Sequence, residues 1–597
     1  MPEATVGAAL AGRRRRDPDQ VVAYVHDRAG DVTRLTVGEL WERACKAAGG
    51  LKALGVGAGD AVALCADTGA DAIAALFGSM LLGAVPFVVE PPLSEARATV
   101  WGERFRHMAA VAAPRALITG SDTSAAVERM GADLGVPVLA PPYQTAAPEH
   151  APLSPASVDA DAPAYLQFTS GTTGDAKAVV ITHRQLYANA VAIARHTPYL
   201  RSDLMVGWLP LHHDMGLVGT VFSTFLHEVP VVLMPPLSFA FRPERWPQAI
   251  SHYRGTLSPA PNFAYHLCAS RASDAALAGL DLSSWRVAYN GAEAVRSDTL
   301  DLWQRRMGPL GFAPHAMQPC YGMAEVGVAV TLSEPGRPPR VLHISRSALA
   351  DTDAVVAVER GDPDAMEVTA VGRPLPGYEV RVEGPDGTEL PERRQGRLII
   401  SGPSLTERYL TANGAGDPSL RADGLDIGDL GFYADGDLFV TGRVKDLIII
   451  GGRNYLPYSL EAAATEVPGI RQGGVAAVGV PHPHKGTESL LVLAESPGAH
   501  DPERSRALAA AVERAIAERT GLRPDQVWLL PLGRLPKTPS GKLQRARITA
   551  LAMAGELDQP LEPPRTGRRG QANLRSPPCQ PSRTIRQPCR ASPATSR

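Results

Sequence analysis

The sequence has little cysteine, almost no net charge and no regular metal-ligand spacing. Its six cysteines are scattered and form no CxxC or Cys/His pattern, which argues against a disulfide framework and a metal site of that kind. A formal net charge of −2 excludes a global basic field, so no nucleic-acid partner is expected. The run Arg13–Arg16 stands beside acidic residues and is interpreted as a solvated face rather than a nucleic-acid or membrane patch.

Long apolar segments are also absent. No run of about 18 apolar residues occurs, so no transmembrane anchoring is expected. The stretch 1–20 lacks the apolar core of a secretory signal. We therefore expect a cytoplasmic protein.

The length of 597 residues indicates more than one domain, because it exceeds what a single hydrophobic core usually holds. The first half alternates strand-like runs such as 60–67 with helical patterns such as 69–85, which predicts a mostly parallel sheet. After about residue 370, turn-linked runs indicate antiparallel strands, and 436–457 is interpreted as a two-strand unit. The segment 505–522 predicts an amphipathic helix that stops at Gly521. The fold class is therefore α/β, with a β-rich subdomain and a small C-terminal α+β domain.

The stretch FTSGTTGDAKA, residues 168–178, has the composition of a phosphate-binding loop. Its glycines are three residues apart and Ala178 follows the lysine, so it is not a Walker loop. The strand 164–168 precedes it, and a second strand follows before a helix that begins near Thr182, so the loop joins two strands as a hairpin. Its small residues would let backbone N–H groups face an anion, aided by hydroxyls and one ammonium. An ordinary polar hairpin is an equally good interpretation of this stretch alone. The candidate phosphate ligands are Thr169, Ser170, Gly171, Thr172, Thr173, Gly174 and Lys177.

Further along the chain, five more motifs occur in a fixed order. They are WLPLHHDMGLVG (208–219), YNGAE followed by YGMAE (289–293 and 321–325), the long segment 426–461, and LPKTPSGKLQR (535–545). Together with the loop, they closely resemble the adenylate-forming superfamily of acyl-CoA synthetases, adenylation domains and luciferases. Ala178 stands where that family prefers glycine.

The resemblance implies roles for individual residues, with ATP and Mg²⁺ as cofactors. His213 would orient the acyl carboxylate, Tyr321 would stack on adenine, and Asp429 would accept hydrogen bonds from both ribose hydroxyls. Glu325, with Thr169, would hold Mg²⁺, which prefers hard oxygen ligands. The remaining nucleotide-binding residues would be Asn290, Gly291, Ala292, Glu293, Gly322, Met323, Ala324 and Arg443.

The same resemblance implies a moving C-terminal part. Lys445 would be a hinge between a large domain, 1–444, and a small catalytic lid domain, 445–558. Lys542, rather than Lys537, aligns with the catalytic lysine, whose ammonium would neutralise charge as pyrophosphate leaves. The basic, Pro/Ser-rich tail 559–597 is expected to be disordered.

The motif details look most like fatty acyl-AMP ligases. The segment 333–370 resembles the insertion of that branch, which is thought to keep the small domain out of the CoA-using pose. This implies a fatty acid as substrate, pyrophosphate release, and acyl transfer to an acyl carrier protein supplied in trans. A CoA ligase is the first alternative. An amino-acid-activating enzyme, with Asp214 facing the ammonium, is the second, and an inactive scaffold is the third.

Overall fold

The largest sheet carries three of the predicted motifs, 208–219, 289–293 and 321–325, at or after the ends of its strands. The computed structural model describes residues 5–92, 98–120, 125–141, 143, 158–169, 177–414, 416–450, 453–481, 488–538 and 541–557. Nine strands lie in the order β17-β14-β13-β12-β11-β9-β10-β1-β2, parallel from β1 through β13 and antiparallel at both edges. They are β1 (Val21–His26), β2 (Val32–Thr36), β9 (Met205–Gly207), β10 (Val231–Leu233), β11 (Leu257–Pro261), β12 (Val287–Gly291), β13 (Met317–Tyr321), β14 (Thr331–Leu332) and β17 (Arg373–Pro374).

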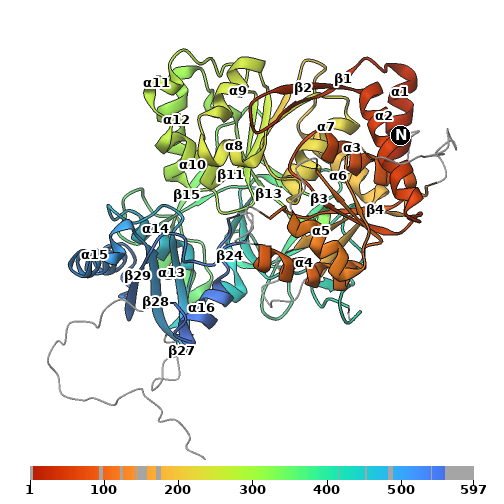
Figure 1. Ribbon diagram of the computed structural model, residues 1–597. Coiled ribbons are helices and arrows are strands. Elements are labelled where there is room, and N and C mark those ends of the chain that lie inside the picture. The colour runs from red at the N-terminus through yellow and green to blue at the C-terminus, as the bar shows by residue number, and fades with distance from the viewer. Residues whose placement is uncertain are drawn as a thin grey trace, which may run out of the picture. The chain divides into compact units, whose positions relative to one another are not determined.

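Helices cover this sheet through aromatic side chains. A buried cluster that includes Trp246, Trp285 and Trp303 joins β9, β11 and β12 to the surrounding helices, which Figure 1 shows beside β11. Aromatic side chains bury large areas each, so this cluster anchors the strand ends that carry the site. The helices of this cluster are α8 (Pro236–Phe241), α9 (Arg245–Tyr253), α10 (Asn262–Arg271), α11 (Asp274–Leu277) and α12 (Ser297–Met307), whereas α7 (Ser223–Leu226) packs through Phe225 in another core cluster.

A second, four-stranded sheet confirms the predicted alternation of strands and helices. Its strands run parallel in the order β4-β3-β5-β6. The predicted strand 60–67 is β3 (Ala61–Cys65), and the predicted helix 69–85 is α3 (Ala70–Leu82). The neighbouring elements are α2 (Val37–Ala53), β4 (Val85–Val88), α4 (Ala98–Ala112), β5 (Ala116–Thr119), α5 (Ala125–Leu134) and β6 (Val138–Leu139).

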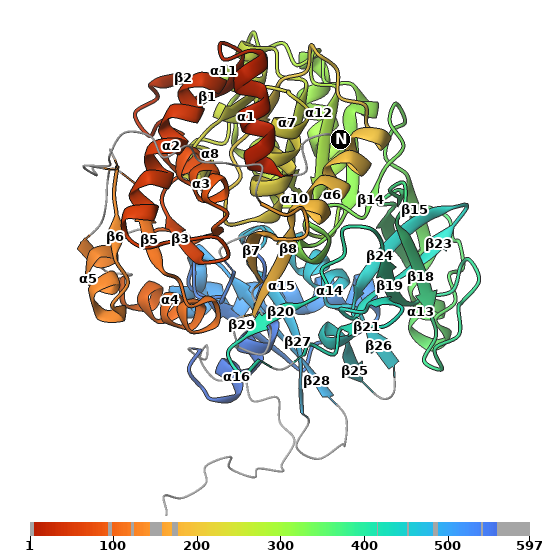
Figure 2. The same ribbon diagram turned by 90° about the vertical axis from the view of Figure 1, so that its right-hand side faces the viewer.

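The predicted hairpin around the phosphate loop is confirmed. Strand β7 (Pro163–Thr169) pairs antiparallel with β8 (Lys177–Thr182), and α6 (His183–His196) begins directly after a capping box on Thr182. A third strand, β20 (Tyr409–Thr411), pairs antiparallel with β8, as Figure 2 shows. The hairpin is therefore tied to a segment more than two hundred residues further along the chain.

The described residues of the second half contain four smaller sheets, two of them among the C-terminal elements. A mainly antiparallel system contains β18 (Glu379–Glu383), β19 (Gly396–Ser401), β21 (Leu420–Arg421), β22 (Gly424–Leu425), β23 (Asp429–Ala434) and β24 (Asp437–Arg443). The segment resembling an insertion forms β15 (Val341–Ser345), α13 (Arg346–Thr352) and β16 (Ala365–Thr369). The C-terminal elements are β25 (Ile448–Ile450), β26 (Arg453–Tyr455), α14 (Pro457–Thr465), β27 (Val475–Pro481), β28 (Glu488–Glu495), α15 (Pro502–Thr520), β29 (Gln526–Leu530) and α16 (Arg545–Met553).

Two sequence interpretations of this half have different outcomes. The helix predicted at 505–522 is confirmed as α15, which ends at Gly521 in the left-handed conformation that glycine favours. The two-strand unit predicted over 436–457 is wrong, because β24 pairs with β23 and β25 pairs with β26. All described residues belong to one compact unit, Met1–Pro560, and the predicted tail 559–597 lies outside the described residues. The predicted domain boundaries stay predictions.

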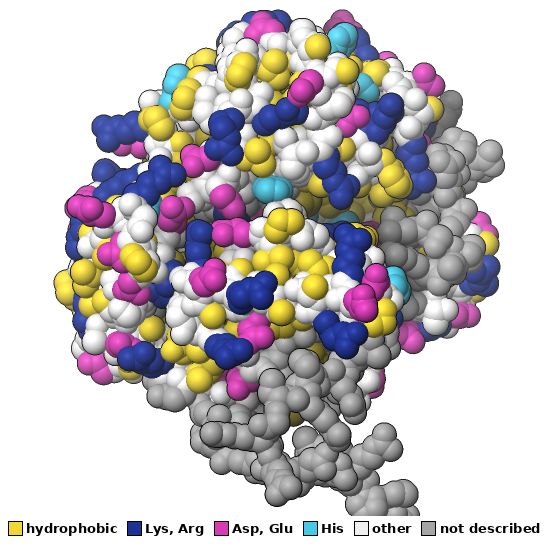
Figure 3. Space-filling view, turned by 90° about the vertical axis from the view of Figure 1, so that its left-hand side faces the viewer, with side chains coloured by type: hydrophobic (Ala, Val, Ile, Leu, Met, Phe, Trp, Pro, Cys, Tyr) yellow, Lys and Arg dark blue, Asp and Glu magenta, His cyan; other side chains and the backbone are white. Residues whose placement is uncertain are grey.

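The arginine run at the N-terminus is more deeply packed than the sequence suggested. It ends α1 (Val6–Arg16), and Arg13 is buried, donating to the carbonyl of Phe225 at 2.7 Å and to Gln20 at 2.9 Å. The interpretation of the whole run as a solvated face is therefore wrong at Arg13. On the face shown in Figure 3, basic and acidic side chains alternate among the coloured residues. None of the described helices has both the length and the hydrophobicity that crossing a bilayer requires.

A buried histidine joins α6 to α1 and predicts acid sensitivity. The Nδ1 atom of His183 accepts from the N–H of Val6 at 3.4 Å, and burial lowers the pKa of His183 to about 4. Below pH 6.5 the imidazole of His183 therefore binds a proton in the unfolded chain but stays neutral in the folded chain. The free energy of unfolding falls as the pH is lowered, until about pH 4. Between pH 7 and pH 5 this loss is about 2 kcal/mol. Urea unfolding of His183→Asn should therefore show a smaller drop in the free energy of unfolding between pH 7 and pH 5, by about that amount.

A matched variant controls for general acid effects. The exposed His315→Asn should leave the difference between pH 7 and pH 5 unchanged. An unchanged pH dependence in His183→Asn would show that this histidine does not carry the acid sensitivity.

Candidate functional site

Three predicted nucleotide-binding side chains meet at the end of β13. The Tyr321 hydroxyl donates to Asp429 Oδ2 at 2.5 Å, and Arg443 Nε lies 2.6 Å from Asp429 Oδ1. Asp429 and Arg443 are directly paired positions of β23 and β24, which explains how residues fourteen apart in sequence meet. The side chain of Asp429 is buried, and such a carboxylate requires a paired charge. Its two oxygens have about four lone-pair sites, so acceptor capacity remains for ribose hydroxyls.

Burial and neighbouring charges also act on the ionisable partners of this cluster. Burial, together with the Asp429 charge, raises the pKa of Tyr321 well above its ordinary value, which keeps the phenol a donor. The Asp429 charge raises the pKa of Arg443, so the guanidinium stays charged. A neutral aromatic donor and a fixed cation therefore face the same carboxylate.

The backbone around the YNGAE and YGMAE motifs is packed too closely for larger residues. A Cβ at Gly322 would lie 1.8 Å from the Val328 carbonyl oxygen, and one at Gly291 would lie 2.6 Å from Cys320 Sγ. Ala292 has φ +66°, a conformation that L-residues rarely adopt and that often marks functional sites. Both motifs therefore need small residues at these positions.

Asn290 has an unused polar atom within this packed region. Its side chain is fully buried, yet its Oδ1 atom has no hydrogen-bond partner. Buried polar atoms are nearly always paired, so an unpaired one points to a missing partner such as a ligand. Met323 and Ala324 are also buried beside Tyr321. This arrangement fits the predicted contact with a purine base.

The predicted metal ligands Glu325 and Thr169 fit a magnesium site that uses substrate oxygens. Burial raises the pKa of Glu325, while the charge of Lys177 opposes that shift. The Oγ1 atom of Thr169 is buried without a hydrogen-bond partner. Among the described residues, no group of three His, Cys, Asp or Glu could hold an ion alone. Mg²⁺ commonly uses one or two carboxylates together with substrate phosphates, and this donor set suits that arrangement.

His213 lies next to a π-helix that follows β9. Its Nδ1 atom is 2.7 Å from Asp214 Oδ1, and Met215–Phe222 forms the π-helix η3, a rare element frequent at functional sites. Burial opposes ionisation of Asp214, but His213, Lys542 and the N–H of Met215 together lower its pKa. Asp214 is therefore an ionised partner of His213.

Glu293 and Lys542 bring the last motif to the same region. Glu293 is an exposed residue, but its carboxylate has many protein atoms around it, and this partial burial raises its pKa. The N–H of Phe263 and the charge of Lys542 oppose that rise. Phe263 N–H donates to Glu293 Oε1 at 2.5 Å. A Cβ at Gly541 would lie 3.9 Å from the Phe263 ring. The C-terminal turn therefore lies against α10. The charge of its Lys542 favours ionisation of two carboxylates from different motifs, Asp214 and Glu293.

The turn that carries Lys542 is held within the C-terminal elements. The N–H of Thr538 donates to the carbonyl of Lys542 at 2.7 Å, and the Lys542 N–H donates to Thr538 Oγ1 at 3.1 Å. The ammonium of Lys537 is instead bound to the carbonyl of Gly473 at 2.5 Å. Lys542 thus has the freer ammonium, in agreement with its alignment to the catalytic lysine.

The phosphate loop is described only at its ends. The predicted ligands Ser170, Gly171, Thr172, Thr173 and Gly174 lie outside the described residues. Lys177, at the start of β8, has its Nζ atom 2.7 Å from Asp417 Oδ2 and 4.2 Å from the centre of the Tyr409 ring. Sequence reasoning missed Asp417 and Tyr409.

Lys445 lies in a short 3₁₀ turn, Val444–Asp446, between two anchored side chains. Arg443 is held by Asp429, while Asp446 Oδ2 lies 3.4 Å from Arg545 Nη1 at the start of α16. Burial lowers the pKa of Lys445. The turn therefore separates a residue bound to the nucleotide cluster from one bound to the C-terminal elements.

Comparisons with known proteins agree with this geometry. The sequence pattern of the AMP-binding enzyme family matches residues 10–410. A Caulobacter vibrioides protein with the provisional name acyl-CoA synthetase is 34% identical over 88% of this chain and 91% of its own. A medium-chain fatty acid–[acyl-carrier-protein] ligase from Moorena producens is 34% identical over 67% of this chain and 70% of its own. A solved structure from work on fatty acyl-adenylate ligases of E. coli and L. pneumophila has a TM-score of 0.85 at 32% identity. The match covers 93% of this chain and 99% of that structure's chain. The chain therefore belongs to the AMP-binding enzyme family, in the adenylate-forming superfamily, and is an enzyme of the fatty acyl-AMP ligase type.

Proposed function

We propose that the protein joins a fatty acid to AMP and passes the acyl group to the phosphopantetheine thiol of a separate acyl carrier protein. ATP and the acid form acyl-adenylate and pyrophosphate in the first step. The position of Lys542 carries this proposal, because its ammonium lies near enough for its charge to favour ionisation of both Asp214 and Glu293. This charge effect supports a catalytic role for Lys542 beside the motifs predicted to hold substrate and adenine.

The first step needs positioning and charge neutralisation. A carboxylate oxygen of the acid attacks the α-phosphorus of ATP, and the bond from that phosphorus to the pyrophosphate oxygen breaks. Tyr321 and Asp429 hold the nucleoside, and His213 orients the acid. Lys177 and Lys542 counter the negative charge that builds on the phosphates, the kind of stabilisation that is usually the largest catalytic contribution. Mg²⁺, held by Glu325 and Thr169, would supply further charge neutralisation when bound.

In the second step the carrier thiol attacks the acyl carbonyl and AMP leaves. Between the steps the C-terminal elements rotate about Lys445. Such hinges are short segments whose backbone angles absorb the change. Arg443 and Asp446, anchored on opposite sides of Lys445, support a pivot at this position.

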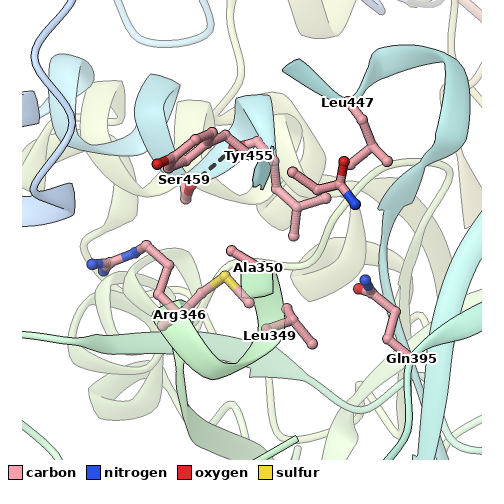
Figure 4. A pocket seen from close by; sticks show the side chains of 10 residues that line it. Arg346, Leu349, Ala350, Gln395, Leu447, Tyr455 and Ser459 are labelled. Carbon is pink, nitrogen blue, oxygen red and sulfur yellow. Dashed lines mark hydrogen bonds between the residues drawn. The ribbon is translucent and has the colours of Figure 1, made fainter. Parts of the chain in front are cut away.

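Contacts of the segment 333–370 support its proposed restraint on that rotation. Arg453 Nε lies 2.8 Å from Asp351 Oδ1, and the Tyr458 hydroxyl contacts Met366 Sδ at 3.1 Å. Figure 4 shows a small cleft between α13 and the C-terminal elements, lined by Leu349 and Tyr455 among others. The exposed ion pair contributes at most about 1 kcal/mol. The apolar cluster that includes Leu349, Met366 and Leu456 is therefore the larger contribution to the restraint.

A pyrophosphate-exchange screen tests the first step. Radiolabelled pyrophosphate should enter ATP only when a fatty acid and Mg²⁺ are present, and mass spectrometry should detect the acyl-adenylate. Acids of graded chain length would define the pocket. Exchange driven by amino acids instead would overturn the fatty-acid assignment. Asp214 favours the fatty-acid reading, because its carboxylate is already paired with His213.

The acceptor preference is a separate prediction. With holo-carrier protein and CoA offered together, the carrier thioester should form at least about tenfold faster than acyl-CoA, a barrier difference of about 1.4 kcal/mol. The measurement is the initial rate of each thioester by mass spectrometry. Equal or faster acyl-CoA formation would identify a CoA ligase.

A further inference from the structure

One tyrosine touches both a predicted phosphate ligand and a predicted metal ligand. The Tyr409 hydroxyl donates to Glu325 Oε1 at 3.0 Å. The ammonium of Lys177 lies 4.2 Å from the centre of the same ring, within cation–π range. Only 8% of Tyr409 is exposed, so the ring has little freedom to leave either partner.

A carboxylate fixes the lysine from another side. Asp417 Oδ2 lies 2.7 Å from Lys177 Nζ. The N–H and hydroxyl of Ser419 donate to Asp417 Oδ1 at 2.9 and 2.6 Å. One oxygen of Asp417 is therefore held by Ser419 while the other holds Lys177 against the Tyr409 ring.

The backbone explains why this arrangement is rigid. In the pairing of β20 with β8, Tyr409 stands opposite Val179 and Thr411 stands opposite Lys177. Just before β20, the N–H of Thr406 donates to the carbonyl of Glu325 at 2.7 Å. The hydroxyl of Thr406 donates to the carbonyl of Val180, also at 2.7 Å. The same short segment is thus bonded to the backbone of both ligand-bearing elements.

We propose that Tyr409 is a positioning residue that sets Glu325 and Lys177 at a fixed separation, so that a cation on one and phosphates on the other are bound cooperatively. The inference rests on the proposed function, which assigns these two ligands their roles. A hydrogen bond on Oε1 leaves the second carboxylate oxygen of Glu325 available to a cation. The ring holds the ammonium without neutralising its charge, unlike a second carboxylate.

Equilibrium binding of a non-hydrolysable ATP analogue tests this coupling without turnover. Calorimetry would give the affinity with Mg²⁺ and with EDTA, and the ratio of the two is the Mg²⁺ enhancement. Tyr409→Phe keeps the ring and loses the hydroxyl, so its enhancement should fall about tenfold, while the EDTA affinity stays within about twofold. Tyr409→Leu also loses the ring, so both quantities should fall.

A matched control separates this effect from general loss of a tyrosine hydroxyl. The Tyr433 hydroxyl donates to the Val380 carbonyl at 2.9 Å, outside the contacts that hold Lys177 and Glu325. Tyr433→Phe should therefore change neither affinity. Equal changes in both Phe variants would overturn the inference.

Glu325→Gln separates failure of the inference from failure of the proposed function. If Glu325→Gln loses the Mg²⁺ enhancement and Tyr409→Phe keeps it, the metal role stands and the positioning role of Tyr409 is wrong. If Glu325→Gln also keeps it, the metal assignment itself fails, and the inference fails with it. Parallel losses in both variants support the inference.

Discussion

Replacement of Lys542 by alanine is expected to lower the rate of acyl-adenylate formation about a thousandfold. The charge of the ammonium favours ionisation of Asp214, at the start of the π-helix after β9, and of Glu293, just after β12. Removing one such charge from a preorganised site costs far more than in water, because the site cannot reorganise to replace it. Acyl transfer from pre-formed acyl-adenylate should survive, because that step involves no pyrophosphate.

The measurement pairs pyrophosphate exchange with single-turnover transfer to the carrier. Lys537→Ala is the matched control, since Lys537 lies in the same segment but its ammonium is bound to the carbonyl of Gly473. This control should lose little exchange activity. Full exchange activity in Lys542→Ala would support the scaffold alternative and remove the catalytic assignment.

The parts of this molecule that sequence predicted are those set by local pattern. Alternating apolar runs gave β3 and α3 because burial selects periodicity within one element. The hairpin of β7 and β8 was predictable because strand, polar loop and strand follow each other directly. The motif residues Tyr321 and Asp429 were recognisable because each stands in a short characteristic frame.

The parts that sequence missed depend on distant pairing. Tyr409 meets Lys177 only because β20 pairs with β8, and no periodicity reveals which distant strand joins a hairpin. Asp417 stands in a Gly-rich polar stretch that has the composition of an ordinary loop. The error at 436–457 has the same origin, because β24 and β25 are adjacent in sequence but belong to different sheets. The buried position of Arg13 was likewise missed, because its guanidinium donates to the carbonyl of Phe225, more than two hundred residues away in the sequence.

Replacement of Lys445 by proline should separate the two half-reactions. Proline fixes its own φ at about −65°, which suits the 3₁₀ turn Val444–Asp446 and holds the backbone angles of that turn in their present conformation. Rotation of the C-terminal elements requires these angles to change. We therefore expect adenylation within about threefold of the original rate and carrier transfer reduced about a hundredfold. Pyrophosphate exchange measures the first, and transfer from pre-formed acyl-adenylate measures the second.

Lys445→Ala distinguishes backbone restriction from loss of the ammonium. Alanine leaves the turn free to rotate, so both half-reactions should continue near their original rates. If alanine damages transfer as much as proline does, the side chain of Lys445 acts directly and the hinge is elsewhere. If proline lowers both half-reactions equally, rotation between two poses is not needed. Selective loss with proline alone places the pivot between Arg443, anchored by Asp429, and Asp446, which is paired with Arg545.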